Sequence, residues 1–343
     1  MKRNKIIILS SIAFVIGIIT TGSLVYSKIF ASNVKQKSTI YIPSGCNFEQ
    51  LEKILSPKLQ SISNFTWVAK LKKYRKIKGG QYTLSQGMNT NELVNLLRSG
   101  KQIPVKLTFN NQHRLEDLAG RISKQIEADS ISLLNAFEEV SFLKENGFTL
   151  TTALGMYIPN SYQCYWNTSA EKFRAKMLRE YNRFWTVKRK ELAKKQQLTP
   201  QQVISLAAIV QKETATVSER PVVAGLYLNR YHSKWPLQAD PTVIFALKEK
   251  YGQDFIVKRV LNKDLSINSA YNTYKHLGIP PGPIAMPDIS SINAVLNPSK
   301  HSYYYMCASI HKIGTHAFAK TLKQHNKNAK KYQIWLSKQG VNR

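Results

Sequence analysis

Acidic residues are scarce in this sequence. The 343 residues include 20 Asp and Glu against 50 Lys and Arg, which gives a formal net charge of +30. A chain this basic is expected to contact something anionic: a nucleic acid, an anionic membrane surface or an acidic polymer. The same scarcity leaves few carboxylates as candidates for acid–base chemistry.

Cysteine is also sparse, and the common catalytic and cofactor motifs are missing from the sequence. Cys46, Cys164 and Cys307 are far apart, and their number and spacing argue against a disulfide framework and against a metal site. No G-x-S-x-G elbow, HExxH pair, Walker loop or dinucleotide fingerprint occurs. The histidines are scattered without metal-ligand spacing. We therefore expect no metal and no cofactor.

The N-terminus carries a long uncharged run, from Ile6 to Tyr26. As a helix this run spans roughly 30 Å, which is enough to cross a bilayer. It is longer than the core of a secretory signal and a poor cleavage site follows it, so it predicts an uncleaved single-pass anchor. Lys2, Arg3 and Lys5 precede the run, which favours a cytoplasmic N-terminus. The rest of the chain then lies outside the cytoplasm, which argues against a nucleic-acid partner.

Three strand-turn-helix units follow, with the sequences TIYIPSGCNFEQLEKIL, QYTLSQGMNTNELVNLL and VKLTFNNQHRLEDLAGRI. Each alternates polar and apolar residues before its turn and repeats leucine at helical spacing after it. Gly45 and Gly87 coincide in the first two turns, where a positive φ is expected, and Gln112 stands there in the third. Farther along, residues 168–197 predict one long charged helix. The Pro-, Gly- and Tyr-rich segments from residue 236 onward predict loops, the usual place for sites.

Glu213 is the most informative acidic residue, because it continues the apolar face of a predicted helix. Thr199 and Gln202 form a capping box and Pro200 suits the first turn, so the helix is expected to begin there. Apolar residues then recur at helical spacing up to Val210, and Glu213 follows three residues later. Burial would raise the pKa of its carboxyl group, as a general acid near neutral pH requires. The alternative is a carboxylate at a frayed helix end that turns to water or caps the next turn.

Two other carboxylates compete with Glu213. Glu219 precedes a second predicted helix, where a negative charge suits the helix dipole and favours a structural role. Asp240 precedes Pro241 and Thr242, and an Asx turn is its simplest explanation. A glycosidase that uses water or a covalent intermediate normally needs two carboxylates. An internal attack by a substrate hydroxyl needs only one, acting first as acid and then as base.

The motifs that surround Glu213 resemble those of the MltG/YceG-like endolytic murein transglycosylases. They are AAIVQKETATVSERPVVAGLYLNR, LQADPTVIFAL, AYNTYKHLGIPPGPIAMP, AVLNPSKHSYYYMCA, GTHAF and HNKNAKKY, in the family's order and spacing. LGMYIPNSY is similar to a further segment of the family. The resemblance covers residues 38–335 together with the anchor. It departs at Gln112, Asn160 and Gln211, where the family usually has Gly, Asp and Glu, and this puts the electrostatic tuning of the cleft in question.

The resemblance implies cleavage of the MurNAc–GlcNAc β-1,4 bond within nascent glycan strands of peptidoglycan, which leaves 1,6-anhydroMurNAc ends, and a role in ending glycan polymerisation. It implies that Glu213 protonates the leaving oxygen and then deprotonates the attacking C6 hydroxyl, with no metal or nucleotide. Seven residues in the matching motifs are expected to line the glycan cleft: Gln238, Asp240, Thr242, Tyr271, Asn272, Thr273 and Tyr274.

We therefore predict an α+β protein with an N-terminal transmembrane helix, a small LysM-like β-α domain and a mixed α+β catalytic domain. The expected limits are 1–37 for the cytoplasmic N-terminus and anchor, 38–103 for the LysM-like domain and 104–343 for the catalytic domain. Residues 6–26 would anchor the chain in the bacterial cytoplasmic (inner) membrane, with the C-terminal domain on the outer face. Expected partners are peptidoglycan glycan strands and peptidoglycan synthases, and not nucleic acid. The alternative is a membrane-anchored wall-binding scaffold without turnover.

Overall fold

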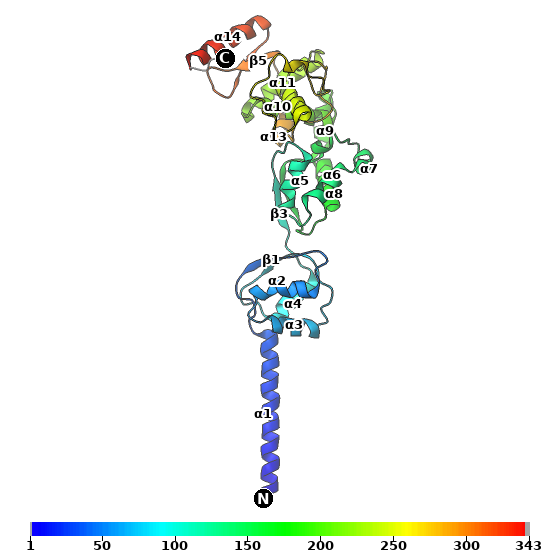
Figure 1. Ribbon diagram of the computed structural model, residues 1–343, viewed down its shortest axis with the longest axis vertical. Coiled ribbons are helices and arrows are strands. Elements are labelled where there is room, and N and C mark those ends of the chain that lie inside the picture. The colour runs from blue at the N-terminus through cyan, green and yellow to red at the C-terminus, as the bar shows by residue number, and fades with distance from the viewer. Residues whose placement is uncertain (1, 340–343) are drawn as a thin grey trace. The chain divides into compact units, whose positions relative to one another are not determined.

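The computed structural model describes residues 2–339, and Figure 1 shows the arrangement of their helices and strands. Helices combine with two-stranded sheets, paired as β1-β2, β3-β4 and β5-β6, so the mixed α+β class is confirmed. Residues 340–343 of the predicted catalytic domain, and the side chains of Lys2 and Arg3, lie outside the described residues.

The chain forms two compact units, which are described separately. The first comprises the chain up to Leu107 together with Lys124–Ala128 and Tyr162–Ser169. The second comprises Thr108–Ser123, Asp129–Ser161 and the chain from Ala170 onward. The domain limits given above stay predictions, and a LysM-like character of the first unit is taken up below as a proposal.

The first unit begins with α1 (Lys2–Phe30), a single apolar helix. Its stretch Lys5–Phe30 has a mean hydropathy of 2.2 and is not buried against the rest of the protein. Apolar side chains along it face outward, and Phe14 is 71% exposed. Such a surface is unfavourable in water, because the transfer of apolar surface from water to an apolar environment lowers the free energy. An N-terminal helix of this length and composition is suited to a membrane anchor or a signal sequence.

The remainder of the first unit is built around a two-stranded antiparallel sheet packed with helices, two of which lie between its strands in the chain. The strands β1 (Ser38–Ile42) and β2 (Gly80–Leu84) pair antiparallel, with Ile40 opposite Tyr82. Three helices share their core: α2 (Phe48–Leu55), α3 (Ile62–Leu71) and α4 (Thr90–Ser99). Alternate strand residues are buried, as expected for a sheet with one face against a core.

The turns of the first two repeated units confirm the sequence analysis. Gly45 has φ 75° and Gly87 has φ 79°, a region that favours glycine because it lacks a Cβ. In the third unit, Gln112 has no positive φ. Its carbonyl accepts the Met286 N–H at 2.9 Å, so this turn is held by a distant segment instead.

The second unit is mainly helical. Two strands lie partly in this unit: β3 (Val105–Phe109) from Thr108 onward and β4 (Asn160–Cys164) up to Ser161. Its first five helices are α5 (Leu115–Ser123), α6 (Ser130–Glu138), α7 (Val140–Glu145), α8 (Ala170–Phe184) and α9 (Val187–Lys195). It continues with α10 (Pro200–Glu213), α11 (Arg220–His232), α12 (Asp240–Tyr251), α13 (Ile289–Leu296), the hairpin of β5 (Tyr305–Ala308) and β6 (His316–Ala319), and α14 (Leu322–Lys338).

The central helix of this unit is α10. Every residue from Val203 to Val210 is buried, and α10 packs against α11 and α13 (Figure 1) as well as against α12. A helix that is apolar all round belongs to the interior rather than to a surface. Its start is the predicted one: Thr199 Oγ1 accepts the Gln202 N–H, Gln202 accepts the Thr199 N–H, and Pro200 occupies the first turn.

Two expectations about secondary structure were wrong. The segment 168–197 forms two helices, because Trp185 turns into the core at 2% exposure and Thr186 caps a new helix through the Arg189 N–H. The segment after Gln238 is helix α12 rather than loop, since Pro241 sits in the first turn, where its missing N–H costs nothing.

Removal of the α10 cap is expected to destabilise the second unit. Thr199→Ala leaves the Gln202 N–H without its side-chain acceptor, and we expect a loss of about 1 kcal/mol in the free energy of unfolding. Chemical denaturation of the detergent-solubilised protein measures it, with Thr199→Ser as the matched control because serine keeps the acceptor oxygen. Equal losses for the alanine and serine variants would contradict the capping role.

Candidate active site

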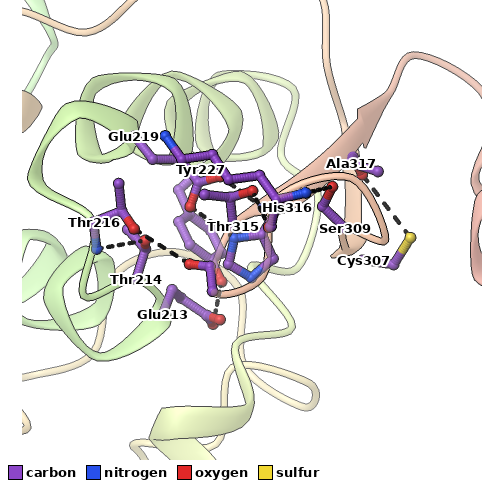
Figure 2. A network of polar contacts seen from close by, with 12 residues as sticks. Glu213, Thr214, Thr216, Glu219, Tyr227, Cys307, Ser309, Thr315, His316 and Ala317 are labelled. Carbon is purple, nitrogen blue, oxygen red and sulfur yellow. Dashed lines mark hydrogen bonds and ion pairs between the residues drawn. The ribbon is translucent and has the colours of Figure 1, made fainter. Parts of the chain in front are cut away.

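Glu213 is the last residue of α10, and the buried body of that helix fixes its position. The side chain is half-buried, and Tyr227 Oη donates a hydrogen bond to Glu213 Oε1 at 2.5 Å (Figure 2). Tyr227 is a residue of α11 and is 1% exposed. The carboxyl group is thus placed by two helices packed against each other, and the alternative of a frayed end free in water does not hold.

The surroundings of Glu213 raise the pKa of its carboxyl group from 4.5 to about 6. Burial is the largest cause, since it disfavours the charged form, and the negative charge of Asp240 adds to it. The Tyr227 hydrogen bond and the positive charges of His316 and Arg230 act in the opposite direction. The group therefore changes its protonation state close to neutral pH, as a proton shuttle must.

Glu219 has a different environment and a structural role. Its Oε1 accepts the backbone N–H of His316 at 2.7 Å, and its Oε2 lies 2.9 Å from the His316 Nδ1 (Figure 2). Both carboxylate oxygens are therefore occupied, and they hold β6 against the start of α11. This agrees with the structural role that its place before a helix predicted.

Asp240 and Tyr274 form a second polar pair near Glu213. Tyr274 Oη donates to Asp240 Oδ1 at 2.6 Å. Burial, followed by the hydrogen bond to Asp240, raises the pKa of the Tyr274 phenol. Asp240 is exposed at the start of α12, so its carboxylate remains accessible to a ligand.

The other predicted cleft residues divide into accessible and buried ones. Gln238 is exposed, and Tyr271 is half-buried with its ring 4.5 Å from the ring of Phe245. Thr242, Asn272 and Thr273 are 2% exposed or less.

The buried three hold backbone in place. Thr242 Oγ1 lies 2.8 Å from Thr273 Oγ1, and Thr273 Oγ1 accepts the Ala239 N–H. Asn272 donates to the carbonyls of Leu265 and Ile267. The two threonines join the segment before α12 to the segment 271–274, and Asn272 joins the latter to residues 265–267. Their effect on a ligand passes through the neighbours that they position.

Three residues near Glu213 were not assigned to the site from sequence. The residues are Tyr227, Arg230 and His316, none of which the sequence motifs distinguished from structural residues. Arg230 is 8% exposed and donates to the carbonyls of Leu237 and Tyr304. Helical spacing could have indicated two of the three, since Tyr227 and Arg230 lie three residues apart on one face of α11, whereas His316 comes from β6 and has no such local signal.

Within residues 2–339 there is no group of three His, Cys, Asp or Glu side chains that could hold a metal ion. The chemistry that this arrangement can support is proton transfer by one carboxyl group with a raised pKa. A phenol donor and a neighbouring carboxylate assist it.

The YceG-like family matches residues 40–331, which is most of the chain. The chain belongs to the YceG-like family. It is 31% identical to a Bacillus subtilis protein named endolytic murein transglycosylase, over 92% of this chain and 91% of that protein. A Streptococcus pneumoniae protein of the same name is 26% identical over 87% of this chain and 58% of its own, longer sequence. The crystal structure of a YceG-like protein from Listeria monocytogenes covers 85% of this chain, at 29% identity and a TM-score of 0.56.

Two departures from the family motifs lie away from the Glu213 carboxyl group. Gln211 Oε1 accepts the backbone N–H of Asp288 and the Ser291 hydroxyl, so it holds the start of α13. Asn160 is exposed and accepts the Ser161 N–H. Neither contact involves a group that shifts the pKa of Glu213.

The raised pKa of Glu213 predicts a pH-dependent gain in stability on Glu213→Gln. In the wild type, the folded state binds the proton of the Glu213 carboxyl group more tightly than the unfolded state does. The stabilisation from this proton is present below about pH 4.5 and is lost as pH rises through about 6. The variant does not titrate there. Its free energy of unfolding relative to wild type should therefore rise by about 1.5 kcal/mol between pH 4.5 and pH 7, since one pKa unit corresponds to about 1.4 kcal/mol. Thermal unfolding across this range measures the change, and the exposed Glu145→Gln is the control. A difference that does not vary with pH would contradict the prediction.

Proposed function

We propose that this protein is an endolytic murein transglycosylase that cuts glycan strands of peptidoglycan. The observation that carries the proposal is the single carboxyl group of Glu213, with a pKa raised to about 6 and a hydrogen bond from Tyr227, within the motif shared with the family. The names of the Bacillus and Streptococcus relatives support the activity. The bond proposed to break is the MurNAc–GlcNAc β-1,4 bond.

One carboxyl group is sufficient for this reaction. Protonated Glu213 gives its proton to the leaving glycosidic oxygen, and the resulting carboxylate then removes the proton from the C6 hydroxyl of the same muramic residue. That oxygen attacks C1 and closes a 1,6-anhydro ring, so no water is consumed and no second base is needed. A pKa near 6 leaves both protonation states accessible, which suits a group that acts as acid and then as base.

The neighbouring groups supply electrostatic stabilisation. Tyr227 donates to Glu213 and so favours its carboxylate state after the first proton transfer. The Asp240 carboxylate is exposed near Glu213, where it would stabilise the positive charge that develops on the sugar ring in the transition state. Gln238, Tyr271 and Tyr274 offer polar and aromatic surface to the sugars, while Thr242, Asn272 and Thr273 position them.

The helix α1 would hold the enzyme at its substrate. We assign it as an uncleaved anchor in the bacterial cytoplasmic membrane, with the rest of the chain on the outer face, where nascent strands emerge. The strand-helix repeat of the first unit fits a LysM-like glycan-binding domain, and peptidoglycan synthases are the expected protein partners. The positive charge would hold the outer part near anionic headgroups or acidic wall polymers. If wall binding were insensitive to salt, that idea would fail.

Product analysis tests the proposed reaction. The detergent-solubilised protein is incubated with uncrosslinked peptidoglycan strands beside Glu213→Gln, and the products are analysed by mass spectrometry. New ends lighter by a water than hydrolysed ends, and absent with the variant, are expected. Reducing ends would mean that water attacks and would make Asp240 the second carboxylate to test. Binding without cleavage by the folded wild type would favour a wall-binding scaffold.

The pH dependence of the reaction tests the role of Tyr227. Since Glu213 must begin protonated, kcat/KM should fall as pH rises through its pKa. Tyr227→Phe removes a hydrogen bond that lowers this pKa, so the fall should shift to higher pH. The control is Tyr231→Phe, which changes a tyrosine of the same helix without a contact to Glu213. An unshifted or lower midpoint for Tyr227→Phe would exclude the assigned role.

A further inference from the structure

A basic pocket lies beside the end of α10 in the second unit. Its volume is 360 Å³. Its charged wall includes His113, Arg114, Lys212 and Lys248, and Ile244 and Phe245 contribute apolar surface. Two lysines from different helices thus face one cavity.

These lysines lack a counter-ion within the described part of the chain. Lys212 Nζ lies 3.5 Å from His113 Nδ1, and neither Lys212 nor Lys248 takes part in an ion pair there. Burial, followed by repulsion from Lys248, lowers the pKa of the Lys212 ammonium. An arriving anion would relieve this repulsion.

The other charged groups of the pocket already have partners. The Arg114 guanidinium pairs with Glu116. Asp117, the one carboxylate in the wall, accepts the Arg114 N–H at 3.2 Å. Burial, with Lys212 next, lowers the pKa of His113, so its ring is neutral at neutral pH. With Arg114 paired to Glu116 and His113 neutral, the remaining charges of the pocket are the two lysine ammonium groups and the Asp117 carboxylate, so positive charge exceeds negative charge by one.

We infer that this pocket binds the carboxylates of the peptide stem that branches from the muramic residue. The inference rests on the proposed function. The bond to be cut lies at C1 of that residue, and the stem is carried by its lactyl group, on the same sugar ring. A pocket that receives the stem would therefore lie close to the catalytic acid.

The connections of the pocket to the site meet this requirement. Lys212 directly precedes Glu213, and the lining residue Pro241 directly follows Asp240. The ring of Phe245 packs at a tilt against that of Tyr271, one of the proposed sugar contacts, at a centroid distance of 4.5 Å. A sugar that contacts Asp240 and Tyr271 would therefore lie next to residues that line the basic pocket.

A second pocket of 290 Å³ continues from the first and reverses the charge. It shares His113, Arg114 and Phe245 with the basic pocket, and Glu138 and Glu249 are in its wall. A peptide stem carries both carboxylates and an amino group. The carboxylates would match the lysines of the basic pocket, and the amino group would match the glutamates of the second pocket. An acidic polymer without cationic groups matches only the first.

Binding to the full-length Glu213→Gln protein in detergent tests the inference without turnover. Calorimetry compares a free stem tetrapeptide with the same peptide after its carboxylates are converted to amides. We expect the acidic peptide to bind at least about tenfold more tightly, because charge-assisted hydrogen bonds to ammonium groups are lost on amidation. The preference should weaken as salt is added.

Lysine variants locate the site. In the Glu213→Gln background, Lys248→Met alone, or Lys248→Met combined with Lys212→Met, should reduce the affinity for the acidic peptide about tenfold or more. The affinity for the amidated peptide should change little. Lys250→Met is the matched control, because Lys250 is exposed on the same helix and does not line the pocket. The affinities of the same proteins for glycan strands with and without peptide stems should follow the same pattern: Lys248→Met should weaken the binding of strands with stems and leave the binding of bare strands little changed.

The outcomes separate this inference from the proposed function. Equal affinity for the two peptides, or a loss that is as large with Lys250→Met, overturns the inference even if the wild type cuts strands. Tighter binding of a polyphosphate than of the acidic peptide, sensitive to Lys248→Met, overturns it in favour of an acidic polymer. A stem preference that depends on Lys248, in a protein whose wild type does not cut strands, supports the pocket and refutes the transglycosylase.

Discussion

The hydrogen bond from Tyr227 to Glu213 depends on the close packing of α10 and α11. The side chain of a helix-end residue would ordinarily turn to water, and here the neighbouring helix supplies both cover and a donor. Close packing continues behind α11. A Cβ on Gly225 would lie 2.5 Å from the Ser299 carbonyl, so only glycine lets that segment approach the helix.

The protonation of Glu213 is a balance set by this packing. Burial raises the pKa of the carboxyl group, and its place at the C-terminal end of a helix adds the negative end of the helix dipole. Tyr227, His316 and Arg230 oppose the shift, so the pKa remains near 6. Complete burial without these partners would keep the Glu213 carboxyl group protonated, and it could not then act as the base in the second proton transfer.

The rest of the site is assembled from segments far apart in the chain. Buried threonine hydrogen bonds join the start of α12 to the segment 271–274, Asn272 joins that segment to residues 265–267, and Glu219 joins β6 to α11. Buried polar groups of this kind hold a unique arrangement, because each loses hydration and must keep its partner. The exposed Asp240 and the half-buried Tyr274 are oriented by residues that a ligand does not touch.

The sequence by itself determined the elements whose signals are local. The apolar run of α1, the capping box of α10 and the positive-φ glycines of the first two turns follow from neighbouring residues, and the motifs around Glu213 gave the family. The helix that starts at Asp240 has a local signal in Pro241, which the loop-forming residues around it obscured. The break between α8 and α9 and the burial of Thr242, Asn272 and Thr273 did not follow, because a core side chain or a distant partner decides them. Likewise, only the tertiary structure could pair Tyr227 with Glu213 and bring Lys212 and Lys248 to one pocket. The pKa of a carboxyl group and the charge of a cavity are sums over neighbours in space, and the order of residues along the chain does not state which neighbours those are.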